Sequence, residues 1–233
     1  GALKCWGSNY SGQLGNGDNT GSKVQIGNAT GEMATLQPVD LGAGRTAKAV
    51  TAGADHTCAI LDNGTVKCWG DNSPGQLGTG NAGTNGGDNE SVASLPTVNL
   101  GVGRTAKAIT AWGNSNCAIL DNNTLKCWGR NADGALGLGD TGDRGDAADE
   151  MGDNLPTVNL GVLVRSFSTA GWHSCAILQN RKVQCWGWNG EGYLEKGALG
   201  LDDDNNRGDN PDEMGNNLPY VNLGAGQIGR AHV

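Results

Sequence analysis

Two short apolar runs on either side of a polar turn form the clearest pattern in the chain, over residues 58–70. The alternating positions and the Asp-Asn-Gly turn between the runs predict a β-hairpin. A three-residue loop places Gly64 where a positive φ angle is needed, which glycine adopts without a Cβ clash. The same register sets Cys58 opposite Cys68 as a non-hydrogen-bonded pair, with Cα atoms about 4.5 Å apart. A disulfide spans that distance, so the pattern predicts a cross-strand disulfide.

The hairpin pattern recurs along the chain, with its two cysteines ten residues apart each time. Full copies occupy residues 117–129 and 175–187, and residues 4–7 are the second half of a further copy. Buried free thiols are the alternative to disulfides, whereas a metal site is disfavoured because each hairpin supplies only two cysteines. We expect Cys5 to bond an upstream residue or a neighbouring chain. The predicted disulfides are Cys58–Cys68, Cys117–Cys127 and Cys175–Cys185.

Each repeat unit continues with the same succession of segments after its Cys-Trp-Gly sequence. A Gly-x-Leu-Gly turn precedes a long polar loop, an apolar strand that begins at proline, a buried strand such as residues 47–53, and the next hairpin. Such units cannot bury both faces of their strands alone, and stacking them radially gives a β-propeller. We therefore predict an all-β fold, a propeller of four-stranded antiparallel blades, with residues 1–233 as one segment. The repeat units span approximately residues 5–67, 68–126, 127–184 and 185–233, the last incomplete.

Three of these motifs resemble the regulator of chromosome condensation repeat. They are Gly75-Gln76-Leu77-Gly78, the sequence His56-Thr57-Cys58-Ala59-Ile60-Leu61, and the Cys-Trp-Gly that follows each hairpin. The resemblance covers the whole chain and implies a propeller usually of seven blades, of which about four unit-lengths are present. It also implies a structural role for the histidine before the hairpin cysteine. Paired cysteines and long acidic loops depart from the intracellular pattern and resemble secreted, disulfide-containing members.

The two ends of the chain fall near the same phase of the repeat, give or take one hairpin. We expect a longer polypeptide to supply the remaining blades. Completion by further copies of this chain is the alternative. It is less favoured because another copy cannot donate the missing Cys-Ala-Ile-Leu strand without removing it from its own hairpin.

Tryptophan supplies most of an aromatic content of only 5%. Trp6, Trp69, Trp128 and Trp186 recur at one position of the repeat, which indicates packing. Trp112, Trp172 and Trp188 do not recur in every unit. If exposed, side chains of this kind are suited to a protein partner or a sugar.

The net charge of −8 is concentrated in residues 138–217, which hold 14 of the 24 acidic residues and 6 of the 16 basic ones. No basic face is evident, so we expect no nucleic-acid partner. No apolar run approaches the length of a membrane-spanning helix, so we expect no membrane insertion.

The acidic loops at residues 140–151 and 203–214 align with each other. Their oxygen-rich side chains, alternating with glycine, are typical of calcium sites, although the spacing does not match an EF-hand. The alternative is that Arg144 and Arg207 pair with these acids. Calcium is the one cofactor that the sequence leaves open, with Asp140, Asp143, Asp146, Asp203, Asp204 and Asp209 as its candidate ligands.

Five Asn-x-Ser/Thr sequons are present, and Asn28 and Asn89, in the long loops, are the candidate glycosylation sites. No catalytic motif appears, so we expect no enzymatic activity. Paired cysteines favour an extracellular or cell-surface location. We therefore expect a structural or protein-interaction scaffold. The alternative is a ligand-binding propeller for calcium, a carbohydrate or a protein inhibitor. Guanine-nucleotide exchange on a small GTPase, the activity best known in the resembling family, is disfavoured by the disulfides and the acidic charge.

Overall fold

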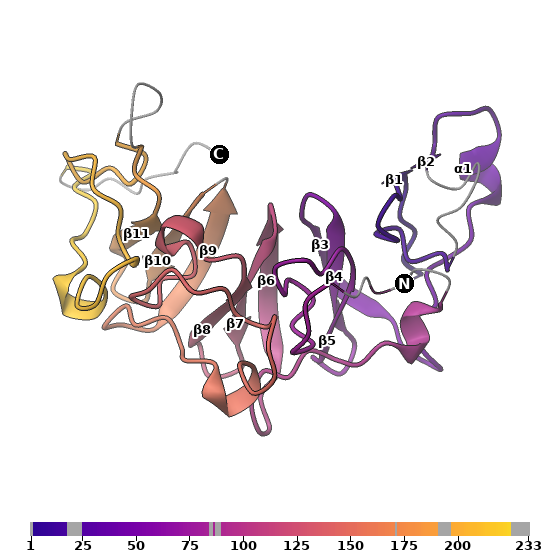
Figure 1. Ribbon diagram of the computed structural model, residues 1–233, viewed down its shortest axis with the longest axis horizontal. Helices are drawn as coiled ribbons and strands as arrows, with labels where there is room; N and C mark the ends of the chain where they lie inside the picture. The colour runs from indigo at the N-terminus through magenta and orange to yellow at the C-terminus, as the bar shows by residue number, and fades with distance from the viewer. Residues whose placement is uncertain are drawn as a thin grey trace.

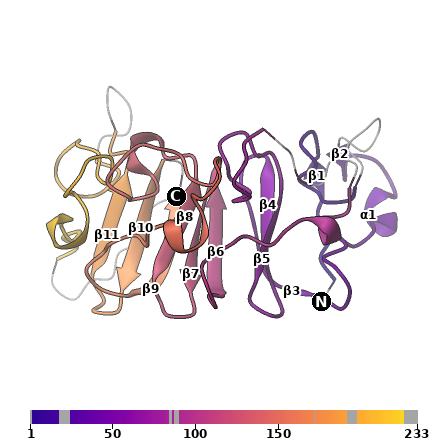
Figure 2. The same ribbon diagram turned by 60° about the horizontal axis from the view of Figure 1, so that its bottom comes forward.

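The computed structural model describes residues 2–17, 25–83, 86, 90–170, 172–190 and 197–224. Three antiparallel sheets stand side by side in chain order, like successive blades of a propeller (Figure 1), and the turned view keeps the same order (Figure 2). Their strands are β3 (Ala47–Ala52), β4 (His56–Leu61) and β5 (Val66–Gly70); β6 (Ala106–Trp112), β7 (Ser115–Leu120) and β8 (Leu125–Gly129); and β9 (Val164–Ala170), β10 (His173–Leu178) and β11 (Val183–Gly187). The short strands β1 (Gly7–Ser8) and β2 (Gln25–Ile26) pair at the N-terminal end. The all-β prediction is confirmed.

The hairpins have the register that the sequence predicts. Cys58 lies opposite Cys68 and Ile60 opposite Val66. The Leu61 amide closes the loop by donating to the Thr65 carbonyl over 2.8 Å. Gly64 has a φ angle of 82°, in the left-handed region that glycine enters most easily.

The segments that begin at proline are extended but are not strands, which corrects the four-stranded blade. In the first full blade, the Val98 amide makes the single backbone bond to Val66, and Val158 and Val221 repeat this contact in the next two blades. Proline has no N–H to donate to a ladder, and the Asn99 side chain accepts from Gly101 to start a turn. A blade is therefore three strands plus one extended segment.

In the first full blade, the inner strand β3 is less buried than the sequence indicates. Residues of β3 alternate between half-buried and exposed, whereas every residue of β4 and β5 is buried. The strand β3 lies at the edge of its sheet, next to β4. The opposite edge strand, β5, is fully buried, so the β4–β5 hairpin carries the core of this blade.

Short helical turns and buried side chains fix the long loops that connect the blades. The turns are α1 (Glu32–Thr35), η2 (Val92–Ser94), η3 (Ala132–Gly134), η4 (Gly152–Asn154) and η5 (Gly215–Asn217). The buried Lys67 ammonium donates to the carbonyls of Val92 and Ala93, and Lys126 anchors Gly152 in the same way. Across the described ranges, none of the helices has the length and apolar character that a bilayer crossing requires.

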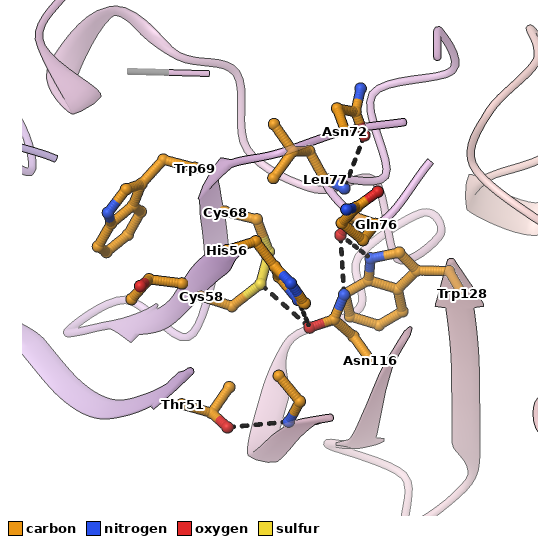
Figure 3. Close-up of a disulfide and its surroundings, with 12 residues drawn as sticks. Thr51, His56, Cys58, Cys68, Trp69, Asn72, Gln76, Leu77, Asn116 and Trp128 are labelled. Atoms are coloured by element: carbon orange, nitrogen blue, oxygen red, sulfur yellow. Dashed lines mark hydrogen bonds between the residues drawn. A yellow bond between two sulfur atoms is a disulfide. The ribbon is translucent and has the colours of Figure 1, made fainter. Parts of the chain in front are cut away.

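A tryptophan of each blade hydrogen-bonds to the Gly-x-Leu-Gly turn of the unit before it. Trp128, which is fully buried, donates from Nε1 to the Gln76 carbonyl over 3.1 Å (Figure 3). Trp69 and Trp186 donate to the carbonyls of Gln13 and Ala135. Trp69, Trp128 and Trp186 therefore pack and orient neighbouring blades, as their recurrence predicts. Trp6 is 63% exposed, which corrects the same prediction for that residue.

Candidate functional site

Three disulfides join the hairpin strands, Cys58 to Cys68, Cys117 to Cys127, and Cys175 to Cys185, with Cα atoms 4.1 Å apart in each. Cys5 is a free, half-buried thiol. Burial raises its pKa to about 11. The pairs are those that the ten-residue spacing indicates.

The first disulfide lies in a buried contact between two blades (Figure 3). Asn116 from the next blade places its Oδ1 atom 3.3 Å from Cys58 Sγ and 2.9 Å from His56 Nε2. Its Nδ2 group donates to the Gln76 carbonyl. Because Oδ1 only accepts, His56 carries its proton on Nε2, and burial lowers the His56 pKa. Disulfide, histidine and asparagine together form a structural contact, in agreement with the role expected of the histidine.

The two acidic loops share one conformation. Arg144 pairs with Asp140 at 2.5 Å, and Arg207 pairs with Asp203 at 2.6 Å. Each arginine also makes an isolated bridge with the glycine that ends a hairpin, Arg144 with Gly129 and Arg207 with Gly187. The arginine brace that the alignment of the two loops indicates is present in both.

A glutamate fixes the second half of each acidic loop. Glu150 Oε2 accepts from the amides of Gly145 and Ala147, and Glu213 makes the equivalent contacts in the other loop. Glu32 does the same near the N-terminus, accepting from Gly27 and Ala29. Sequence reasoning missed this third copy, although the signal is present in the shared Gly…Glu-Met pattern of residues 27–33, 145–151 and 208–214.

The candidate calcium ligands do not form a metal-binding group. Asp140 binds Arg144 and Asp143 accepts from the Asn131 amide, while in the second loop Asp203 binds Arg207. Asp204 is exposed, and Asp146 and Asp209 each have one buried carboxylate oxygen without a hydrogen bond. Within the described ranges, no three acidic, histidine or cysteine side chains gather as a metal site would require. Calcium binding stays a prediction that a binding measurement must decide.

The structure describes only one of the two candidate glycosylation sites. Asn28 is exposed, and its side-chain amide donates to Gln25. Asn89 lies outside the described residues. The sequon asparagine Asn9 is fully buried, so a glycosyltransferase cannot reach it in the folded chain. Asn28 remains a predicted site.

An exposed aromatic cluster lies where the turns of two successive blades meet. Trp112 and Trp172 are 46% and 47% exposed. The guanidinium carbon of Arg130 lies 5.2 Å from the centroid of the Trp172 ring, a cation–π distance. These three residues, called here the tryptophan–arginine cluster, line a cavity of about 220 Å³ together with Asn114 and Ser115. Trp188, the third non-recurring tryptophan, is half-buried and does not line it.

Backbone contacts hold the tryptophan–arginine cluster on rigid turns. The Arg130 amide donates to the Asn114 carbonyl, and the Ser115 hydroxyl donates to the Arg130 carbonyl over 2.6 Å. Trp188 makes the equivalent amide bond to Trp172 in the next blade. Sequence reasoning missed Arg130. The available signal was that the residue after Cys-Trp-Gly changes from unit to unit while its neighbours repeat.

Sequence profiles of the regulator of chromosome condensation (RCC1) repeat match residues 1–60, 47–76 and 164–192. These matches agree with the repeated hairpins and the row of blades. Residues 1–76 and 164–192 of the chain are therefore made of regulator of chromosome condensation repeats.

Relatives of this RCC1-repeat chain include regulatory proteins. The Ultraviolet-B receptor UVR8 of Arabidopsis thaliana is 31% identical over 202 residues, which are 84% of this chain and 40% of the receptor. The X-linked retinitis pigmentosa GTPase regulator of Mus musculus is 33% identical over 138 residues, which are 59% of this chain and 12% of that protein. The RCC1-repeat chain thus spans two fifths or less of the length of these relatives.

Solved structures agree on the fold. Prp20p of Saccharomyces cerevisiae superposes with a TM-score of 0.63 at 20% identity, covering 95% of this chain and 46% of Prp20p. Human WBSCR16 superposes with a TM-score of 0.59 at 19% identity, covering 85% of this chain and 47% of that protein. At these identities the likeness shows the RCC1-type propeller fold alone.

Proposed function

We propose that this chain is a non-enzymatic propeller segment that binds protein partners outside the cell or at its surface. The observation that carries the proposal is the tryptophan–arginine cluster, which exposes two large aromatic side chains on a scaffold whose recurring tryptophans in the full blades are fully buried. Tryptophan and arginine are the residues most enriched at the energetic centres of protein interfaces. The cluster therefore has the composition of a protein-binding surface.

The repeat separates the scaffold from the binding surface. Residues that recur, such as Trp128 and the paired cysteines, make contacts within and between blades. The residue type directly after Cys-Trp-Gly is not repeated, because Asp71, Arg130 and Trp188 occupy this position in successive units. Loops on a rigid scaffold commonly hold the binding residues of a protein, since their sequence can change without altering the fold.

The relatives support a protein partner. Prp20p has binding properties toward Gsp1p and histones, and one curated relative is a GTPase regulator. The three disulfides support the extracellular location, because such bonds persist in oxidising compartments and are rare in the cytosol. These features favour an extracellular interaction scaffold over a nuclear exchange factor.

A comparison of captured proteins tests the proposal. The disulfide-bonded protein, a Trp112→Ala/Trp172→Ala double variant and a Tyr220→Ala control would each be incubated with extracellular proteins of the source organism. Tyr220 is a matched control because it is 40% exposed and also makes a cation–π contact, with Lys182. We expect proteins enriched on the wild type and the control to be reduced at least tenfold on the double variant. Equal capture by all three would refute the proposed surface.

A further inference from the structure

Building on the proposed function, we propose that the tryptophan–arginine cluster binds an acidic peptide segment. In that segment, a bulky apolar side chain lies next to an aspartate or glutamate. The apolar side chain enters the cavity that Trp112 and Trp172 line, and Arg130 binds the carboxylate.

Among the described residues, Arg130 forms no salt bridge. Arg45, Arg104, Arg144 and Arg207 each form a salt bridge with an aspartate. Within the described part of the chain, by contrast, no carboxylate pairs with Arg130, whose guanidinium lies over the ring of Trp172. A guanidinium stacked on an aromatic ring keeps its N–H edge available and is held in place, which favours bidentate binding of a carboxylate.

The cavity beside Arg130 suits one apolar side chain. Its volume of about 220 Å³ lies below the roughly 300 Å³ at which pockets for small molecules begin. Much of its remaining lining is apolar, because Ala54, Ala132 and Ala135 contribute with Gly113. An aliphatic or aromatic side chain entering between the two exposed indoles would bury apolar surface on both of them.

The same lining favours a peptide over a sugar. A sugar ring needs several hydrogen-bonding partners around its edge, and the cavity offers few polar side chains. One of them, the Ser115 hydroxyl, already donates to the Arg130 carbonyl. A single fixed cation beside an apolar cavity matches an apolar side chain followed by a carboxylate.

The net charge of the protein makes the Arg130 contact specific. At −8, the chain as a whole repels an acidic peptide instead of attracting it. The peptide carboxylate must therefore gain its binding energy locally, at Arg130. Loss of the guanidinium then reduces affinity by about tenfold or more, the range of a hydrogen bond to a charged group.

A selection from a random peptide library tests the proposal directly. The target is the disulfide-bonded chain with Cys5→Ser, so that the free thiol cannot form mixed disulfides. We expect enriched peptides to share a bulky apolar residue within two positions of an aspartate or glutamate. Their affinities would then be measured by calorimetry for the target and for its Arg130→Ala, Trp172→Ala and Tyr220→Ala variants.

The expected pattern separates charge from packing. Arg130→Ala and replacement of the peptide acid by its amide should each weaken binding by about tenfold, and the two losses should not add. Trp172→Ala should weaken binding at least as much, and Tyr220→Ala should have no effect. Circular dichroism and the intact mass without reductant confirm that each variant keeps its fold and disulfides.

Three results would overturn the proposal. If the selected peptides bind the Arg130→Ala variant as tightly as the wild type, their binding site lies elsewhere on the propeller. An acidic-glycan array that binds through Arg130 while no peptide does reassigns the cluster to sugars. A selection that yields no binder rejects a linear peptide ligand. Capture of a folded protein partner through the cluster would still support the proposed function in each case, so the two failures are distinguishable.

Discussion

Trp6 and Trp69 occupy the same position in successive repeat units, yet Trp6 is 63% exposed and Trp69 is fully buried. Trp69 donates its indole N–H to the Gln13 carbonyl in the turn of the preceding unit. Among the described residues, no preceding turn covers Trp6. Met33 and Met151 differ in the same way, at 46% and 9% exposed. In the full blades, a tryptophan and an apolar side chain thus pack against the Gly-x-Leu-Gly turn of the preceding unit, as Trp128 and Met151 do at Gly78.

The first prediction compares two tryptophans of the repeat. Trp128→Ala should destabilise the protein by about 3–5 kcal/mol, because it removes a fully buried indole and its hydrogen bond to Gln76. Trp6→Ala should change the stability by about 1 kcal/mol or less, as expected for an exposed side chain. Urea unfolding of both variants is the measurement. Equal losses at the two sites would contradict the blade contact described for Trp128.

The second prediction concerns the cross-strand disulfides. Replacing Cys117 and Cys127 together by alanine should lower the free energy of unfolding by about 2–3 kcal/mol, since the bond closes a short loop in the unfolded chain. Cys5→Ser should leave stability almost unchanged, because Cys5 is unpaired within the chain. Thermal unfolding without reductant compares the three proteins. A double variant as stable as the wild type would show that the strand register holds the hairpin without the bond.

The hairpins were predictable because their information is local. The turn at Gly64 sets the register, and the register places Cys58 opposite Cys68. Inner-strand burial was not predictable in this way. Val50 is 49% exposed and Ile109 only 8%, although they occupy equivalent places in β3 and β6. Identical local patterns acquire different burial when different neighbours lie against them.

The tryptophan–arginine cluster shows the same limit at the candidate site. The sequence singled out Trp112 and Trp172 because they break the repeat. It gave no reason to join Arg130 to them, because Arg130 follows one hairpin and Trp172 precedes the next. Only the placement of successive blades brings the guanidinium over the ring. The prediction that the proline-initiated segments form strands fails for a local reason. Proline lacks the N–H that a strand ladder needs, and this loss prevails over the apolar pattern that favours a strand.

The third prediction is a loss of stability in mild acid caused by His56. Burial lowers the pKa of His56 below its ordinary value of 6.5, against the opposing effects of Asn116, Asp71 and Asp55. Below pH 6.5, His56 therefore binds a proton in the unfolded chain but stays neutral in the folded chain. The free energy of unfolding thus falls as the pH drops. The decrease is at most about 1.4 kcal/mol per pH unit for one such group. His56→Gln retains a donor toward Asn116 without titrating.

The measurement for this prediction is the difference in unfolding free energy between wild type and His56→Gln. Carboxylate titration affects both proteins alike and cancels in the difference. We expect the wild type to lose stability relative to the variant between pH 7 and pH 5. Parallel pH profiles would show that His56 does not contribute.

The fourth prediction addresses the acidic loops and calcium. Arg144→Ala should loosen residues 140–151 and raise their rate of amide hydrogen exchange. The global cost should be about 1 kcal/mol or less, since the Arg144–Asp140 pair is partly exposed. Arg45→Ala, at another exposed pair, is the control and should not affect this loop.

Because the arginine and backbone amides already bind several of these carboxylates, we expect a chelator to leave the melting temperature unchanged. A calcium-dependent rise in that temperature would instead establish a structural ion.

The fifth prediction is that Cys5 reacts slowly with alkylating reagents at neutral pH. Its burial raises the thiol pKa to about 11, and the thiolate is the reactive form. The folded protein should therefore react far more slowly than a free thiol with a pKa of about 8.5 at the same pH. The rate should rise steadily as the pH approaches 11. Rate measurements by mass spectrometry across that range, with the unfolded chain as the control, give the pKa directly. A folded-state rate equal to that of the unfolded chain at pH 8 would mean that Cys5 is exposed, and would place the N-terminal blade edge differently from the structure described above.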